Sequence, residues 1–132
     1  MAANITFKHA ADADAWAIHA DPRLEALTAA LCDVAAGHGV PMPLVVTSFW
    51  RPTDRDSVHA YGRGADFRTR DWPWPVAQLL ADEMNARYVY SHDPARAGKH
   101  VAVYEPDAPG GSHLHLQVPP PGLGPWPRSQ PA

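Results

Sequence analysis

Six residues near the end of the chain, 113–118 (HLHLQV), constrain its fold more than any other stretch, because polar and apolar side chains alternate along them. Alternate side chains of a β-strand point to opposite faces of the sheet. The pattern therefore predicts a strand whose leucines and valine pack on a core, while His113, His115 and Gln117 share the other face. Two imidazoles on one face can share a metal ion, although a solvated histidine-rich edge would show the same pattern.

The rest of the hydrophobic pattern predicts two main helices and several short strands. Asp21 is a capping residue before Pro22, apolar residues then recur every three or four positions, and Gly37 ends the segment. A second helix is expected from Val76 to about Arg87. Runs of β-branched and aromatic residues predict strands at 44–49, 62–68, 88–90, 100–104 and 113–118. This mixed order indicates an α+β fold with a small, mostly antiparallel sheet.

The length of 132 residues favours one domain with one hydrophobic core. Six of the fifteen prolines lie in the last fourteen residues, which predicts a solvated, extended, proline-rich tail at 119–132. We therefore place the single domain at residues 1–118.

Charge and cysteine content exclude several kinds of partner and site. The net charge is -3 with neutral histidines and the eleven Lys and Arg residues form no dense cluster in the sequence, so we expect no binding to nucleic acid. No segment has the roughly 18 apolar residues of a membrane span, and no signal-peptide pattern is present, which predicts synthesis in the cytoplasm without membrane insertion. Cys32 is the only cysteine, so a metal site must use histidine and carboxylate ligands.

A second polar cluster lies at residues 57–67 (SVHAYGRGADF). Its two glycines disfavour the interior of a helix, so we expect a loop leading into a strand that brings His59 beside Asp66. These residues supply one nitrogen and one oxygen ligand, and His115 would complete a set of three. Three protein ligands with a fourth position open for water are typical of a catalytic zinc site.

The residues of both clusters resemble a known family. A serine two residues before a histidine, an aspartate seven residues after that histidine and a late H-x-H strand are similar to the zinc D-alanyl-D-alanine carboxypeptidases and L-alanyl-D-glutamate endopeptidases of the hedgehog-type (DD-peptidase) fold. The segment 48–52 (SFWRP) also resembles their strand-end motif, so the resemblance covers about residues 24–118. It implies one zinc ion per chain, held by His59, Asp66 and His115, and a peptidoglycan peptide as substrate.

The resemblance also implies roles for the residues around the ligands. It places a catalytic or transition-state-stabilising role on His113, and a catalytic oxyanion contact or a substrate contact on Arg51. Ser57, which begins the motif, either contacts the substrate or shapes the loop through a turn hydrogen bond.

The general base is where the chain departs from the family. Members with an acidic base commonly place it three residues before the last ligand, and this chain has Ser112 there. The base is therefore His113, Glu105 or Asp107. The same departure supports an alternative hypothesis, in which the chain is a non-catalytic, zinc-containing structural or binding module of a virion.

The function expected from the resemblance is hydrolysis of peptidoglycan stem peptides or cross-links by a zinc metallopeptidase, either a carboxypeptidase or an endopeptidase. Without a secretion signal or a cell-wall-binding domain, the chain resembles phage endolysins and virion-associated lysis enzymes. These enzymes reach the cell wall through a partner pore (holin) or an injection device. A bacterial enzyme that trims muropeptides is the other expected context.

Overall fold

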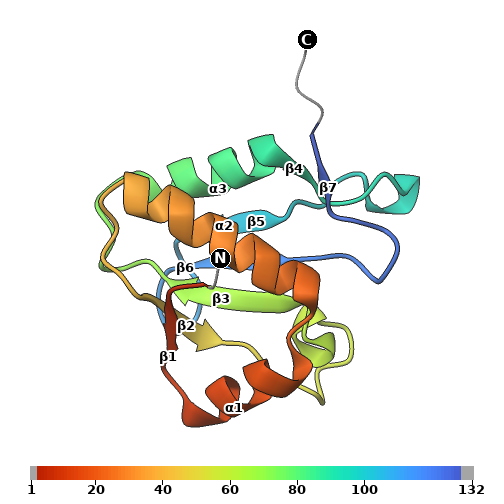
Figure 1. Cartoon of the computed structure of the whole chain (residues 1–132), viewed down its shortest axis with the longest axis horizontal. Coiled ribbons are helices and arrows are strands. Elements are labelled where there is room, and N and C mark those ends of the chain that lie inside the picture. The colour runs from red at the N-terminus through yellow and green to blue at the C-terminus, as the bar shows by residue number, and fades with distance from the viewer. Residues whose placement is uncertain (1–2, 129–132) are drawn as a thin grey trace.

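The computed structural model describes residues 3–128, and its centre is a five-stranded sheet (Figure 1). The strands are β1 (Ile5–Phe7), β2 (Leu44–Ser48), β3 (Gly64–Arg68), β5 (Ala102–Glu105) and β6 (His113–Gln117). Their spatial order is β1-β2-β3-β6-β5, and every neighbouring pair is antiparallel except β1 and β2. The chain therefore has the α+β class and the mostly antiparallel sheet that the sequence predicts.

Two helices, α2 (Pro22–Gly37) and α3 (Val76–Arg87), pack on one face of this sheet (Figure 1). The Asp21 side chain accepts a hydrogen bond from the backbone N–H of Arg23 and so caps α2 as expected. The apolar residues on the inner sides of both helices are fully buried and form the core with the sheet, among them Leu24, Leu31, Leu80 and Met84.

A third helix, α1 (Ala10–His19), corrects the expectation of two main helices. Its sequence, AADADAWAIH, has no apolar stripe, and only Asp12 and Ala15 are buried in it. The Asp12 side chain instead accepts a hydrogen bond from the backbone N–H of Trp50, at 2.9 Å. This polar contact and the packing of one large side chain, Trp16, against Phe49 hold the helix, and hydrophobic periodicity reveals neither contact.

Strands β3 and β6 have two faces of opposite character. Their register pairs Asp66 with His115 and Arg68 with His113 on one face, and Phe67 with Leu114 on the other. The residues of the second face are fully buried under α2 and α3: Ala65, Phe67, Leu114 and Leu116. The predicted alternation in 113–118 is confirmed, and it leaves the first face free to carry polar groups.

The segment before β3 is a short 3₁₀ helix, η1 (Val58–Tyr61), where the sequence predicts an irregular loop. Ser57 caps it, because the Ser57 hydroxyl accepts a hydrogen bond from the backbone N–H of His59 at 3.2 Å. Gly62 ends it in a left-handed conformation with φ of 68°, and a Cβ at this position would collide with the carbonyl of His19. The turn fixes His59 at the end of β3 that contains Gly64.

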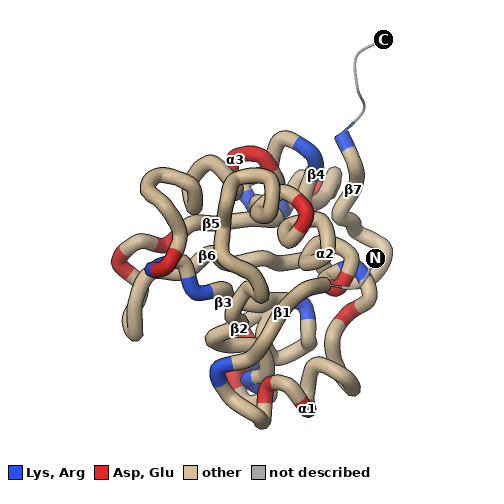
Figure 2. Tube along the Cα trace, turned by 60° about the vertical axis from the view of Figure 1, so that its left-hand side comes forward, with Lys and Arg blue, Asp and Glu red and all other residues tan. Residues whose placement is uncertain are grey.

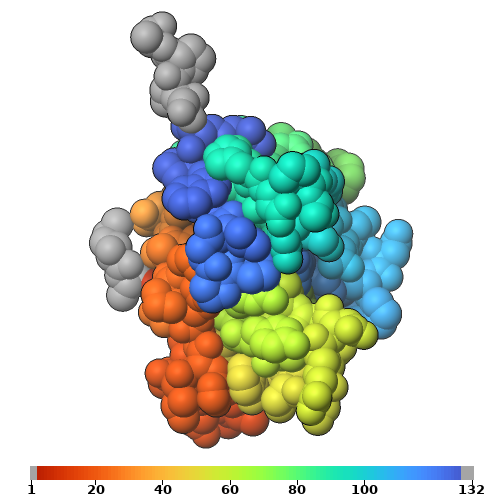
Figure 3. All heavy atoms as spheres, turned by 90° about the vertical axis from the view of Figure 1, so that its right-hand side faces the viewer, coloured from red at the N-terminus to blue at the C-terminus, as the bar shows by residue number. Residues whose placement is uncertain are grey.

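The expected solvated tail packs on the body of the protein as far as it is described. The Arg23 guanidinium donates hydrogen bonds to the carbonyls of Pro120 and Gly124. Figure 3 shows the blue C-terminal segment lying between the orange part of the chain and the teal loop, where η2 (Pro94–Arg96) lies. The predicted strand at 88–90 is β4 (Tyr88–Val89), which pairs with β7 (Trp126–Pro127) in a separate two-stranded sheet. Residues 129–132 lie outside the described part.

Charged residues are sparse in the five strands of the main sheet, and most lie on helices and connecting loops (Figure 2). Only Asp66, Arg68 and Glu105 carry a formal charge in these strands. All three line the same cavity. None of the helices in residues 3–128 is both long and apolar enough to cross a membrane.

Candidate metal centre

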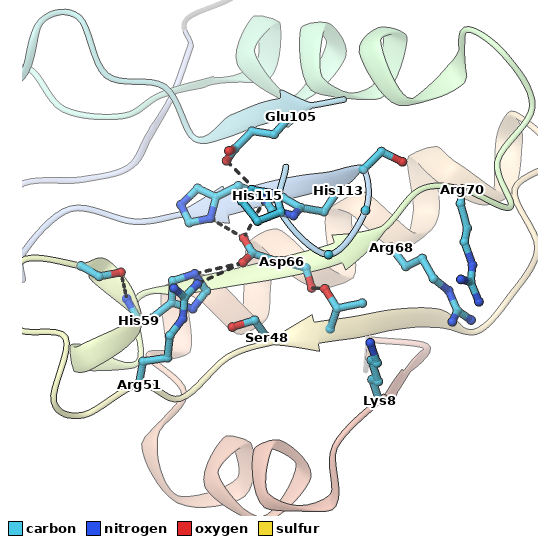
Figure 4. Close-up of a pocket in the computed structure, with 16 residues that line it drawn as sticks. Lys8, Ser48, Arg51, His59, Asp66, Arg68, Arg70, Glu105, His113 and His115 are labelled. Atoms are coloured by element: carbon cyan, nitrogen blue, oxygen red, sulfur yellow. Dashed lines mark hydrogen bonds and ion pairs between the residues drawn. The ribbon is translucent and has the colours of Figure 1, made fainter. Parts of the chain in front are cut away.

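The polar face of β3 and β6 forms the floor of an open cavity of about 700 Å³ (Figure 4). This volume is in the range of small-molecule and peptide-end sites in proteins. Loops before η1 and between β5 and β6 provide its walls. The cavity brings together every site residue that the sequence predicts, namely Arg51, Ser57, His59, Asp66, His113 and His115. Glu105 also lines it, whereas Asp107 is exposed and is not among the lining residues.

Three of these residues form a group that could hold a metal ion. His59, Asp66 and His115 each offer one ligand atom, and the three atoms lie within 4.8 Å of one another. His59 Nε2 is 3.3 Å from Asp66 Oδ2, and His115 Nδ1 is 2.7 Å from Asp66 Oδ1. Ligand atoms around a tetrahedral zinc ion are about 3.3 Å apart, so this spacing needs only small adjustments to fit an ion.

The His59 ring is held in the tautomer that a metal ligand requires. Its Nδ1 lies 2.8 Å from the carbonyl oxygen of Phe49, which can only accept a hydrogen bond. The proton is therefore on Nδ1, and the lone pair of Nε2 faces Asp66. The imidazole is 2% exposed, so water does not compete for this hydrogen bond.

His115 is oriented by a chain of two hydrogen bonds that the sequence analysis did not identify. The Gln117 amide donates through Nε2 to the carbonyl oxygen of His100 at 2.8 Å, which turns its Oε1 toward the histidine. His115 Nε2 is 3.1 Å from that oxygen and donates to it. The lone pair of His115 Nδ1 therefore faces Asp66. The alternation of 113–118 places Gln117 on this face, but the partnership with His100 depends on the pairing of β5 with β6.

These tautomers bring three electron-pair donors together. Nε2 of His59 and Nδ1 of His115 both face the Asp66 carboxylate. In the neutral rings, whose other nitrogens donate as described, both atoms present lone pairs, whereas in the protonated rings each donates to Asp66. Asp66 is itself only 5% exposed. Converging lone pairs in a buried place repel one another unless a proton or a metal cation lies between them. The donor set thus fits a bound metal ion.

Asp66 is ionised in this setting. Burial alone raises the pKa of its carboxyl, but hydrogen bonds and charge interactions with His115 and His59 in their protonated forms outweigh burial and hold the pKa well below its usual range. The Arg51 guanidinium adds a positive charge, with Nη2 3.2 Å from Asp66 Oδ2. A carboxylate that keeps its charge is available as a metal ligand at any neutral or mildly acidic pH.

A pair of residues, His113 and Glu105, lies beside His59, Asp66 and His115. His113 Nε2 is 3.3 Å from Glu105 Oε1 and 3.8 Å from Asp66 Oδ1, so this ring nitrogen lies between two carboxylates. Ser112 has a structural partner, since the Thr69 hydroxyl donates to the Ser112 hydroxyl at 2.9 Å. Of the three expected bases, His113 and Glu105 are therefore the two that lie at the site.

Comparisons of the chain with models of protein families, with curated proteins and with solved structures found no match. What the cavity does must therefore be inferred from its own donor atoms and charges, together with the motifs that those residues form in the sequence.

Proposed function

We propose that this protein is a zinc peptidase that hydrolyses peptidoglycan stem peptides or cross-links. The observation that carries the proposal is the convergence of lone pairs from His59, Asp66 and His115 on the floor of an open cavity. Two imidazoles and one carboxylate are a donor set that zinc accepts, and a catalytic site needs the cavity for its substrate. The class of substrate comes from the resemblance of the surrounding motifs to the DD-peptidase-type enzymes.

The three ligands would hold zinc at the floor of the cavity. When bound, zinc supplies Lewis-acid chemistry that makes an amide carbonyl and a water molecule reactive near neutral pH. The protein holds the ion in place through the Phe49 carbonyl and the Gln117 amide, which fix the two imidazoles. Such outer hydrogen bonds commonly change metal affinity by about 10- to 100-fold.

We assign proton transfer to the pair of His113 and Glu105. As the water oxygen bonds to the carbonyl carbon, the water gives up one proton to this pair. The proton then passes to the nitrogen of the leaving amine as the C–N bond breaks, so the pair returns to its starting state. His113 Nε2 and Glu105 Oε1 are 3.3 Å apart, which allows one proton to be shared between them.

Arg51 is the cation that opposes negative charge developing on the substrate. Its guanidinium lines the cavity and lies beside Asp66, close to where the scissile carbonyl would lie. A fixed guanidinium stabilises an oxyanion or a peptide carboxylate without rearrangement during the reaction. Ser57 makes the turn hydrogen bond to His59 described above, so its first role is to shape the site.

The test is a digest of purified peptidoglycan by the zinc-loaded protein, read by mass spectrometry, followed by a defined muropeptide to identify the cleaved bond. We expect a released D-alanine or a new amino terminus. His113→Ala should keep one zinc ion per chain and lower kcat by about 10²- to 10⁴-fold. His9→Ala, which changes an exposed histidine outside the cavity, should leave the rate unchanged. No product from the zinc-loaded wild type would contradict the proposal.

Ser112 favours a second candidate function, a zinc-containing module of a virion without turnover. The Ser112 hydroxyl is engaged with Thr69 and supplies no carboxylate to the site. This candidate predicts stoichiometric zinc with no hydrolysis of any muropeptide, whereas the peptidase predicts both. For the peptidase, the context that we propose is a phage endolysin or virion-associated lysis enzyme.

A further inference from the structure

The cavity contains a second polar region that the metal centre does not use. Lys8, Arg68 and Arg70 line it, and Figure 4 shows their side chains together at the end away from His59 and Arg51. We call these three residues the cationic end. Lys8 lies far from Arg68 and Arg70 in the sequence, so the sequence alone does not show that the three form a cluster.

The fold brings the three residues together through the main sheet. Arg68 follows Asp66 by two residues on the same face of β3, a separation of about 7 Å along a strand. Lys8 comes directly after β1, and its backbone N–H donates to the carbonyl of Val46 in β2 at 2.9 Å. Because β2 lies between β1 and β3, this pairing places Lys8 on the β1 side of the cavity, across β2 from Arg68.

The cationic end has little opposing charge of its own. Within residues 3–128, the side chains of Lys8 and Arg70 form no ion pair. Arg68 Nε lies 3.4 Å from Asp71 Oδ2 but makes no hydrogen bond with any described residue. Three cations close together repel one another by Coulomb's law. An anion bound from outside the chain would replace that repulsion with attraction.

The charge of the whole cavity also favours an anionic ligand. Four of the chain's eleven basic residues line it, and only two acidic residues do, although the net charge of the chain is -3. Asp66 is engaged by the ligand histidines and Arg51, and Glu105 by His113. The cationic end therefore keeps its positive charge in an otherwise acidic protein, where it attracts an anionic part of a ligand.

We propose that the cationic end binds a carboxylate of the substrate peptide, about two residues from the amide that lies at the metal centre. The inference rests on the proposed function, and it names a feature that the substrate must have. Guanidinium groups bind carboxylates through paired hydrogen bonds, and a lysine amine adds a point charge. Extended peptide advances about 3.3–3.6 Å per residue, which matches the spacing of Arg68 from Asp66. Stem peptides that contain glutamate carry such a carboxylate.

The test compares two synthetic stem peptides that differ only in this carboxylate, which is free in one and amidated in the other. For the zinc-loaded wild type, we expect KM to be about tenfold lower for the free carboxylate, with similar kcat. The double variant Lys8→Ala/Arg70→Ala should lose this preference. Both residues are exposed, so the variant should fold normally, and Arg55→Ala, an exposed arginine outside the cavity, serves as the matched control.

Calorimetric titration of the same peptides into metal-free protein separates this inference from the proposed function. Tighter binding of the free carboxylate by the wild type, but not by the double variant, supports the cationic end even if no peptide is cleaved. Cleavage of both peptides with equal KM, together with equal binding, would overturn the inference and leave the peptidase intact. Preference retained in the double variant would also overturn it.

Discussion

The two faces of strands β3 and β6 differ in almost every physical property, although they are formed by alternate residues of the same two segments. One face consists of fully buried apolar side chains under α2 and α3. The other carries Asp66, His113 and His115, whose polar atoms are held by hydrogen bonds and ion pairs at the floor of a cavity. Residues of one face therefore determine stability, and their sequence neighbours on the other face form the candidate site. Substitutions one position apart should change either the free energy of unfolding or metal binding.

The largest effect on stability is expected on the apolar face. Phe67→Ala removes a fully buried aromatic ring from the core and should lower the free energy of unfolding by about 3–5 kcal/mol, measured by urea denaturation of the metal-free protein. Leu79→Ala, at a side chain that is 46% exposed on α3, should change it by less than about 0.5 kcal/mol. Equal losses in the two variants would show that this face does not form the core.

A smaller effect is expected at Gly64, which lies on the same face of β3 as Asp66 and close to η1. A Cβ there would collide with Val58 Cγ2 and lie 3.2 Å from His115 Cε1. Gly64→Ala should therefore destabilise the protein by about 1–3 kcal/mol and also weaken zinc binding, because η1 and the His115 ring must move apart.

Gly98→Ala provides the control for Gly64→Ala, since no atom lies within 4 Å of the added carbon. Thermal denaturation and zinc titration should show no loss in this variant. If Gly64→Ala behaves like the control, the close approach of η1 to the ligand histidine is wrong.

The smallest effect on stability is expected from Gln117→Ala, which should instead weaken the affinity for zinc. Without the amide, His115 loses the acceptor for its Nε2 proton, so the Kd for zinc should rise by about 10- to 100-fold. The free energy of unfolding of the metal-free protein should change by less than about 0.5 kcal/mol.

Gln78→Ala is the matched control for the loss of a glutamine side chain, because Gln78 is exposed on α3 and its amide donates to Asp82, away from the cavity. It should leave the Kd for zinc unchanged, as measured with a competing chelator. An unchanged Kd in Gln117→Ala would mean that this amide does not orient the ligand.

Local sequence signals account for the elements that were predicted correctly. Asp21 and Pro22 mark the start of α2 because capping and a fixed φ are local effects. Strand β6 follows from its strict alternation, which one buried face demands. The apolar pattern does not predict helix α1, because a hydrogen bond to Asp12 and the packing of the single side chain of Trp16 hold it. The solvated tail expected at 119–132 instead packs on the protein over the described residues 119–128, because a proline-rich composition fits both arrangements.

The candidate site also combines features that local sequence predicts with features that depend on tertiary contacts. The spacing of His59 and Asp66 and the H-x-H strand predict the three residues that the fold groups as a possible metal site, since each motif is contiguous in sequence. The hydrogen bond from Gln117 to His100 and the approach of Lys8 to Arg68 required knowledge of which strands pair. Strand order is a tertiary property that separate segments do not encode individually.

The most direct test of the metal centre is calorimetric titration of zinc into the metal-free protein. We predict saturation at one ion per chain in the wild type and at least a 100-fold loss of affinity in Asp66→Asn, which keeps the side-chain shape but removes the ligand charge. Asp54→Asn removes a carboxylate that lies near Arg51 but outside the ligand group, and it should bind zinc like the wild type. Absence of saturable binding in the wild type, or unchanged affinity in Asp66→Asn, would contradict the proposed centre.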